Sequence, residues 1–173
     1  MSDHVPSNPP ADDIRLAALA KKLAHALSAQ GFKLATAESC TGGWIAKCLT
    51  DIPGSSDWFE RGFVTYSNSA KQDSLGVSAE TLSLHGAVSE QAVREMAAGV
   101  LRHSQAQLAI AVSGIAGPAG GSADKPVGTV WFGWAWPDRS VTAQCCQFDG
   151  DREAVRRAAV ATALQGLLDG LPG

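Results

Sequence analysis

Three residues of this sequence, Ser39, Tyr66 and Lys71, have the side chains needed to hydrolyse an acyl group. A serine needs a base before it can act as a nucleophile. A lysine that is desolvated in a cleft can be neutral near pH 7 and can take the proton. Tyr66 could relay this proton or orient either partner. Ser39 follows an expected strand, Tyr66 ends another, and Lys71 opens the next helix. Because the carboxyl ends of strands gather at one edge of an α/β sheet, we expect the three side chains to converge there.

The run at residues 36–43, Thr-Ala-Glu-Ser-Cys-Thr-Gly-Gly, is expected to turn the chain from a strand into a helix. The first N–H groups of such a helix are unpaired and carry the positive end of its dipole, so they could bind an anion or stabilise an oxyanion. Each candidate also has a simpler interpretation. Ser39 could be a helix N-cap, Lys71 a solvated helix residue and Tyr66 an amphipathic residue at the rim.

Other catalytic patterns do not fit the sequence. The four histidines, at positions 4, 25, 85 and 103, are not placed to complete a triad with Ser39. Ser39 does not begin an S-x-x-K motif, which argues against a β-lactamase site. The first strand is not followed by G-x-G-x-x-G, and this argues against a dinucleotide-dependent reductase.

Two further clusters could bind an anion. Residues 113–125 form a glycine-rich loop after an expected buried strand, and its N–H groups could cradle a phosphate, although a flexible surface loop explains the composition equally well. Arg152 and Arg156 lie one turn apart at the start of the last helix, where they oppose the helix dipole. This placement indicates an anionic partner, unless the nearby acidic residues 149, 151 and 153 pair with them.

Length and composition favour one globular domain. The chain has 173 residues, 45% of them hydrophobic, and a net charge of −3 without a long basic run, which argues against nucleic acid or a membrane surface as the main partner. Its apolar runs are too short to span a bilayer, and residues 1–10 have no signal-peptide pattern.

The four cysteines, at 40, 48, 145 and 146, have no metal-ligand spacing, so we expect reduced thiols in a cytosolic protein and no metal site.

The alternation of patterns predicts a three-layer α/β/α sandwich around a mixed, mostly parallel sheet of about five strands. We expect a disordered tail at 1–11 and a single domain at 12–170. Helices are expected at 13–30, 44–51, 71–75, 79–84, 90–104 and 152–168, and strands at 32–35, 62–66, 108–112, 127–136 and 141–148. The last two strands are expected to form a hairpin.

Taken together, several motifs resemble the CinA C-terminal domain family over about residues 12–168. They are the 36–43 run, Pro-Gly-Ser-Ser at 53–56, Tyr-Ser-Asn at 66–68 with Lys71, Gly-Ala-Val-Ser at 86–89, Ser-Gly-Ile-Ala-Gly-Pro at 113–118 and Lys-Pro-Val-Gly-Thr-Val at 125–130. The resemblance is greatest to the stand-alone nicotinamide-nucleotide amidases of this family. Full-length members carry a further N-terminal domain associated with pyrophosphatase activity, and we do not expect that activity here.

The resemblance implies hydrolysis of nicotinamide mononucleotide to nicotinate mononucleotide and ammonia, in the recycling of pyridine nucleotides. It implies a serine–lysine site with Ser39, Lys71 and Tyr66, no metal or cofactor, and a cytoplasmic homodimer. The candidate substrate contacts are Cys40, Thr41, Gly42, Asn68, Ser113, Gly114, Gly117, Arg152 and Arg156. Two alternatives are a non-catalytic nucleotide-sensing module and an amidase for another small amide.

Overall fold

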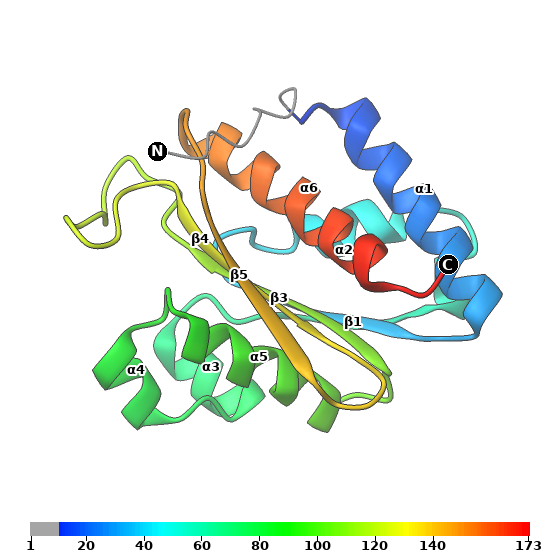
Figure 1. The fold of residues 1–173 in the computed structure, drawn as a ribbon, viewed down its shortest axis with the longest axis horizontal. Coiled ribbons are helices and arrows are strands. Elements are labelled where there is room, and N and C mark those ends of the chain that lie inside the picture. Colours follow the sequence, from blue (N-terminus) through cyan, green and yellow to red (C-terminus); the bar gives the residue numbers. More distant parts are fainter. Residues whose placement is uncertain (1–10) are drawn as a thin grey trace.

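The computed structural model describes residues 11–173, so nearly all of the expected disordered tail falls outside the described residues. In this part the chain forms a five-stranded sheet with helices on both faces (Figure 1). The elements in order are α1 (Asp13–Gln30), β1 (Leu34–Glu38), α2 (Trp44–Thr50), the short 3-10 helix η1 (Ser55–Asp57), β2 (Phe59–Val64), α3 (Asn68–Leu75), α4 (Ala79–His85), α5 (Glu90–Arg102), β3 (Leu108–Gly114), β4 (Thr129–Ala135), β5 (Val141–Gln147) and α6 (Arg152–Gly170).

The sheet has the strand order β2-β1-β3-β4-β5. β1 pairs in parallel with both β2 and β3, whereas β4 is antiparallel to β3 and to β5. Four strands therefore run in one direction and β4 runs against them, which confirms the mixed sheet and the terminal hairpin. Helices α1, α2 and α6 lie on one face, and α3, α4 and α5 lie on the other (Figure 1).

Each face of the sheet has its own apolar cluster. Leucines of α1 and α6 pack on one side, and residues of α5 pack on the other. The leucines of α1 recur at helical spacing and form one buried stripe: Leu16, Leu19, Leu23 and Leu27. All five residues of β1 are buried, as expected for the inner strand of a three-layer fold. The contact with α5 is close at Gly133, where a Cβ would lie 2.7 Å from the carbonyl oxygen of Val93. A side chain at this position would push the helix away from the sheet.

Side-chain caps determine where most helices begin. Asp12, Ser67, Ser78, Ser89 and Asp151 each accept a hydrogen bond from an N–H in the first turn of the helix that follows. These caps confirm the predicted starts after Asp12 and Ser89.

Two strand boundaries were predicted wrongly. β1 continues to Glu38, because the carboxyl half of the strand pairs with β2 and β3 on both sides; the polar residues 36 and 38 suggested a turn but are buried. β2 begins at Phe59 and ends at Val64, earlier than predicted. It is an edge strand whose middle residues are exposed, so it lacks the apolar run of a buried strand.

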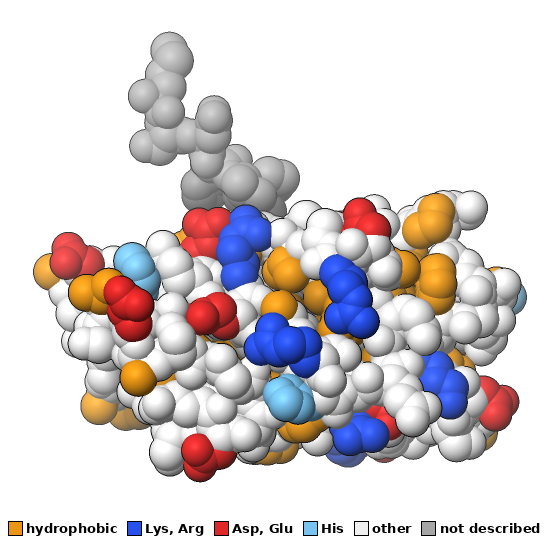
Figure 2. Space-filling model, turned by 90° about the horizontal axis from the view of Figure 1, so that it is seen from below, with side chains coloured by type: hydrophobic (Ala, Val, Ile, Leu, Met, Phe, Trp, Pro, Cys, Tyr) orange, Lys and Arg blue, Asp and Glu red, His pale blue; other side chains and the backbone are white. Residues whose placement is uncertain are grey.

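Charged side chains are dispersed on the face that Figure 2 shows, which lies on the α3–α5 side. Basic and acidic groups are interspersed there and do not gather into one broad basic surface. Among residues 11–173, helices are too short or too polar to cross a membrane.

Candidate active site

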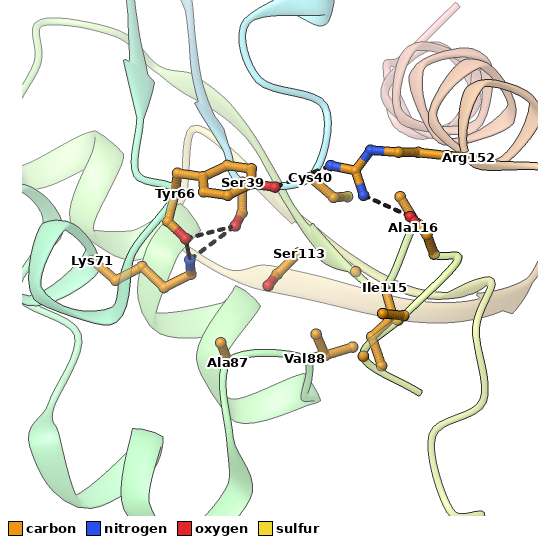
Figure 3. A pocket seen from close by; sticks show the side chains of 14 residues that line it. Ser39, Cys40, Tyr66, Lys71, Ala87, Val88, Ser113, Ile115, Ala116 and Arg152 are labelled. Carbon is orange, nitrogen blue, oxygen red and sulfur yellow. Dashed lines mark hydrogen bonds between the residues drawn. The ribbon is translucent and has the colours of Figure 1, made fainter. Parts of the chain in front are cut away.

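Ser39 and Lys71 meet at the carboxyl ends of the neighbouring strands β1 and β2 (Figure 3). Ser39 directly follows β1, and its N–H donates to the carbonyl of Val112 in the neighbouring β3, 3.0 Å away. Lys71 lies near the start of α3, and its Nζ donates to the Ser39 Oγ at 2.9 Å. The same Nζ donates to the carbonyl oxygens of Thr65 at 2.7 Å and Tyr66 at 3.3 Å. The predicted convergence of Ser39 and Lys71 is therefore present in the structure.

Lys71 is a buried cation with no carboxylate bound to it in the described part of the chain. Its exposed fraction is 1%, and its hydrogen-bond partners are a hydroxyl and two carbonyls. Burial disfavours the charged form and lowers the pKa of Lys71 from 10.5 to about 8. The side chain is therefore not the solvated helix lysine that its sequence context also allowed.

The three contacts of Lys71 suit both of its protonation states. An ammonium can donate three hydrogen bonds, one to each partner. A neutral amine keeps two donors for the carbonyls of Thr65 and Tyr66 and turns its lone pair toward the Ser39 hydroxyl. The lysine can therefore accept and return a proton without a change in the arrangement of heavy atoms.

A buried carboxylate organises the turn that carries Ser39. Glu38 is 1% exposed, and its two carboxylate oxygens accept the N–H groups of Ile45 at 2.8 Å and Ala46 at 3.0 Å. The N-cap residue of α2 is Gly43, not Ser39, so the N-cap interpretation of Ser39 is wrong. The expectation that the start of α2 receives a substrate anion is also wrong for these two N–H groups, because Glu38 already occupies them.

Tyr66 contributes its backbone and its side chain to different parts of the site. Its carbonyl faces the serine–lysine pair, with the Ser39 Oγ 3.5 Å away. Its phenol points toward α6 and accepts a hydrogen bond from Arg152 at 3.1 Å, while a second nitrogen of Arg152 donates to the carbonyl of Gly117 at 2.7 Å (Figure 3). Arg152 thus links the rim near Tyr66 to the glycine-rich loop. The proton-relay role of the phenol stays a prediction.

A cavity of about 280 Å³ opens beside the pair. It is lined by eight residues that the sequence predicts for the site: Ser39, Cys40, Tyr66, Lys71, Ser113, Gly114, Gly117 and Arg152. The remaining predicted contacts, Thr41, Gly42, Asn68 and Arg156, do not line it. Thr41, Gly42 and Arg156 border a separate groove on the other side of the Ser39 turn.

The sequence-based prediction missed the apolar wall of the cavity. Ala87, Val88, Ile115 and Ala116 line it together with the polar groups. Two of these residues lie in the Gly-Ala-Val-Ser motif at 86–89, which was a signal for the family but not for the site.

Cys40 is the other nucleophilic side chain that lines the cavity. Burial raises the pKa of its thiol to about 11, so it stays protonated near neutral pH. Ser39 with its lysine is therefore the better nucleophile. Among residues 11–173, we find no group of three or more histidine, cysteine or acidic side chains that could hold a metal ion.

We compared the chain with known protein families, proteins and solved structures. The CinA C-terminal domain family matches residues 16–171. A protein from Enterobacter agglomerans named nicotinamide-nucleotide amidohydrolase PncC is 60% identical over 154 residues, which are 89% of this chain and 94% of that protein. Its namesake from Escherichia coli (strain K12) is 58% identical over 156 residues, with 90% and 94% covered. A solved structure of a competence/damage inducible protein, CihA, from Agrobacterium tumefaciens has a TM-score of 0.87 at 45% identity, with 98% of both chains covered.

The fold and the site define an α/β/α sandwich protein with a serine–lysine pair at the carboxyl edge of its sheet. The chain belongs to the CinA C-terminal domain family, which confirms the resemblance seen in the sequence. The amidohydrolase name of relatives that are 58–60% identical over nearly their whole length supports an enzyme of that class.

Proposed function

We propose that this chain hydrolyses the carboxamide of nicotinamide mononucleotide, with Ser39 as the nucleophile and Lys71 as its base. The observation that carries the proposal is the 2.9 Å contact between the Lys71 Nζ and the Ser39 Oγ, with a lysine whose pKa is lowered to about 8 by burial. A protein that only senses a nucleotide has no need for a neutral lysine beside a cavity serine. The names of the relatives supply the substrate.

The reaction can be written with these two side chains alone. Neutral Lys71 takes the Ser39 hydroxyl proton while Oγ bonds to the amide carbon, which gives a tetrahedral oxyanion. Lys71 then returns the proton to the amide nitrogen, the C–N bond breaks and ammonia leaves. Water, deprotonated by Lys71, attacks the carbonyl carbon of the Ser39 ester. When the ester C–O bond breaks, Lys71 returns this proton to the Ser39 Oγ and nicotinate mononucleotide leaves. Lys71 ends in the state in which it began.

Arg152 is the proposed phosphate contact. It lies at the start of α6 and lines the cavity, and within the described residues it forms no ion pair. Its present partners, the Tyr66 hydroxyl and the Gly117 carbonyl, are neutral and can be exchanged for phosphate oxygens. The glycine-rich loop that carries Gly117 borders the same end of the cavity and supplies further N–H groups. The proposal also includes three points that the family resemblance implies. The protein is a homodimer, it is cytoplasmic, and it acts in pyridine-nucleotide recycling.

Ammonia release by the purified protein tests the activity. Incubation with nicotinamide mononucleotide should yield ammonia and nicotinate mononucleotide in equal amounts, and Ser39→Ala should yield neither. A wild-type protein that binds the mononucleotide without releasing ammonia would instead support the sensing module. Release from other small amides at higher catalytic efficiency would change the substrate but not the chemistry.

Comparison of the mononucleotide with its riboside, which lacks the phosphate, tests the assignment of Arg152. Losing a charge-assisted hydrogen bond costs about 1.5–3 kcal/mol, so Arg152→Ala should lower kcat/KM on the mononucleotide roughly 10- to 150-fold. The riboside should be nearly unaffected. Equal proportional losses on both substrates would mean that Arg152 supports the rim of the site and not the phosphate.

A further inference from the structure

Arg156 contacts the back of the turn that carries the nucleophile. Its Nε donates to the carbonyl oxygen of Cys40 at 3.0 Å, and its Nη2 donates to that of Thr41 at 3.2 Å. The guanidinium carbon also lies 5.4 Å from the centre of the Trp44 ring. Arg156 borders the separate groove that Thr41, Gly42 and Trp44 also line, here called the outer groove, and it does not line the cavity beside Ser39.

The turn is also held by backbone hydrogen bonds: the Ser39 N–H donates to the carbonyl of Val112 at 3.0 Å, and the Trp44 N–H donates to the carbonyl of Thr41 at 3.0 Å. The N–H of Gly42 donates to the Ser39 carbonyl at 3.1 Å, which closes a tight turn over residues 39–42. The carbonyls of the two central residues point outward, where Arg156 binds both of them. Because two hydrogen bonds to a planar guanidinium fix direction as well as distance, this contact determines how the turn presents Ser39 to Lys71.

The same contact bears on the group that stabilises the oxyanion. Glu38 occupies the N–H groups of Ile45 and Ala46, so the start of α2 cannot serve. Cys40 lines the cavity, and within residues 11–173 its N–H is bonded to no other residue, only to the thiol of Cys40 itself. It directly follows the nucleophile, the position from which a backbone N–H stabilises the oxyanion in other serine hydrolases. Arg156 holds the carbonyl at the other end of this same residue.

We propose that Arg156 is a positioning residue, which holds the Ser39 turn from behind so that the Ser39 hydroxyl meets Lys71 and the Cys40 N–H faces the oxyanion. The inference rests on the proposed hydrolase function. It assigns Arg156 a role different from the substrate contact expected from the sequence, although Arg152 lies only one turn away on α6.

The neighbouring Arg157 provides a matched control. Its guanidinium carbon lies 4.9 Å from the centre of the same Trp44 ring, but its hydrogen bonds go to Asp13 and Glu153 and not to the turn. Arg156→Ala and Arg157→Ala therefore remove the same side chain from the same helix and the same aromatic face. Only Arg156→Ala removes the contact with the turn.

The test is steady-state kinetics on both the mononucleotide and its riboside. Complete removal of an oxyanion donor costs about 10²–10³ in kcat, and misplacing the turn should cost less, roughly 10- to 100-fold. Arg156→Ala should show this loss of kcat by the same factor on both substrates, with KM changed little. Arg156→Lys, or guanidinium ion added to Arg156→Ala, should recover part of it. Arg157→Ala should keep the wild-type kcat.

Two results would overturn the proposal. A loss confined to the mononucleotide would make Arg156 a phosphate ligand, and an unchanged kcat on both substrates would show that the turn holds its shape alone. Thermal unfolding of both alanine variants identifies a general loss of stability; if Arg156→Ala does not fold, the kinetics of Arg156→Lys decide. The rate at which a fluorophosphonate labels Ser39 needs no amide substrate. It therefore tests Arg156 even if the wild type releases no ammonia, a result that would defeat the proposed function instead.

Discussion

The pH dependence of the reaction follows directly from the burial of Lys71. Its pKa of about 8 means that roughly one tenth of the lysine is neutral at pH 7. If the neutral amine is the base, kcat/KM should rise about tenfold per pH unit below pH 8 and become level above it. Lys71→Arg should be nearly inactive at every pH, because a guanidinium stays protonated and cannot act as a base.

The same pKa predicts a stability change with a definite sign. Below pH 8 the lysine is charged in the folded and unfolded states, and the folded state bears the cost of a buried charge. Between pH 8 and 10.5 the folded protein loses the proton first, so stability rises with pH over this window. The shift from 10.5 to about 8 corresponds to at most about 3 kcal/mol, and less where water in the cavity screens the ammonium.

Lys71→Met isolates this contribution in denaturant unfolding at several pH values. Cys40 acts in the opposite direction, because burial raises its thiol pKa to about 11 and its ionisation in the unfolded state lowers stability at high pH. The quantity to measure is therefore the free energy of unfolding of the wild type minus that of Lys71→Met. This value should become more positive as the pH rises from 8 to 10.5. A rate that is flat from pH 6 to 10, or an active Lys71→Arg enzyme, would refute Lys71 as the base.

Three further outcomes are expected. Ser39→Ala should lower kcat by several orders of magnitude while the mononucleotide still binds, as measured by calorimetry; near-wild-type turnover would rule out an acyl-enzyme. Glu38→Gln should lower the free energy of unfolding by about 2–4 kcal/mol in urea, because an amide cannot accept both N–H groups of α2, and an unchanged midpoint would contradict this account of the turn. Gly166→Ala should destabilise the fold by about 1–3 kcal/mol, since its Cβ would lie 2.1 Å from the Trp134 ring; wild-type stability would show that the indole moves freely.

Local chemistry made much of the fold predictable from the sequence. Helix starts after Asp12 and Ser89, and the helix stops at Gly31 and Gly76, follow from capping, which depends only on neighbouring residues. The order of elements and the terminal hairpin follow from apolar periodicity. The errors at β1 and β2 have one cause: the extent of a strand depends on partners that are distant in the sequence.

The state of Lys71 could not be predicted in this way. It lies in α3, a short and largely polar helix, where a lysine is normally solvated. It is buried because β1 and β2 pair in parallel and bring the carbonyls of Thr65 and Tyr66 over the Ser39 turn. Residue type and position made Lys71 a candidate base, but only the family resemblance favoured this role over that of a solvated lysine before the structure was known.

The two arginines of α6 show the same limit more sharply. Arg152 and Arg156 are separated by one helical turn, so the sequence makes both of them candidates for one anion and favours Arg152 only because it lies closer to the start of the helix. In the fold the first lines the cavity and the second reaches across the outer groove to the carbonyls of Cys40 and Thr41. Helix α6 therefore contributes one arginine to the cavity and a second to the backbone of the turn that carries Ser39. We therefore expect Arg152→Ala to lower activity only on the substrate that carries the phosphate, and Arg156→Ala to lower it equally with and without the phosphate. The charge and spacing of the two residues in the sequence do not predict this difference.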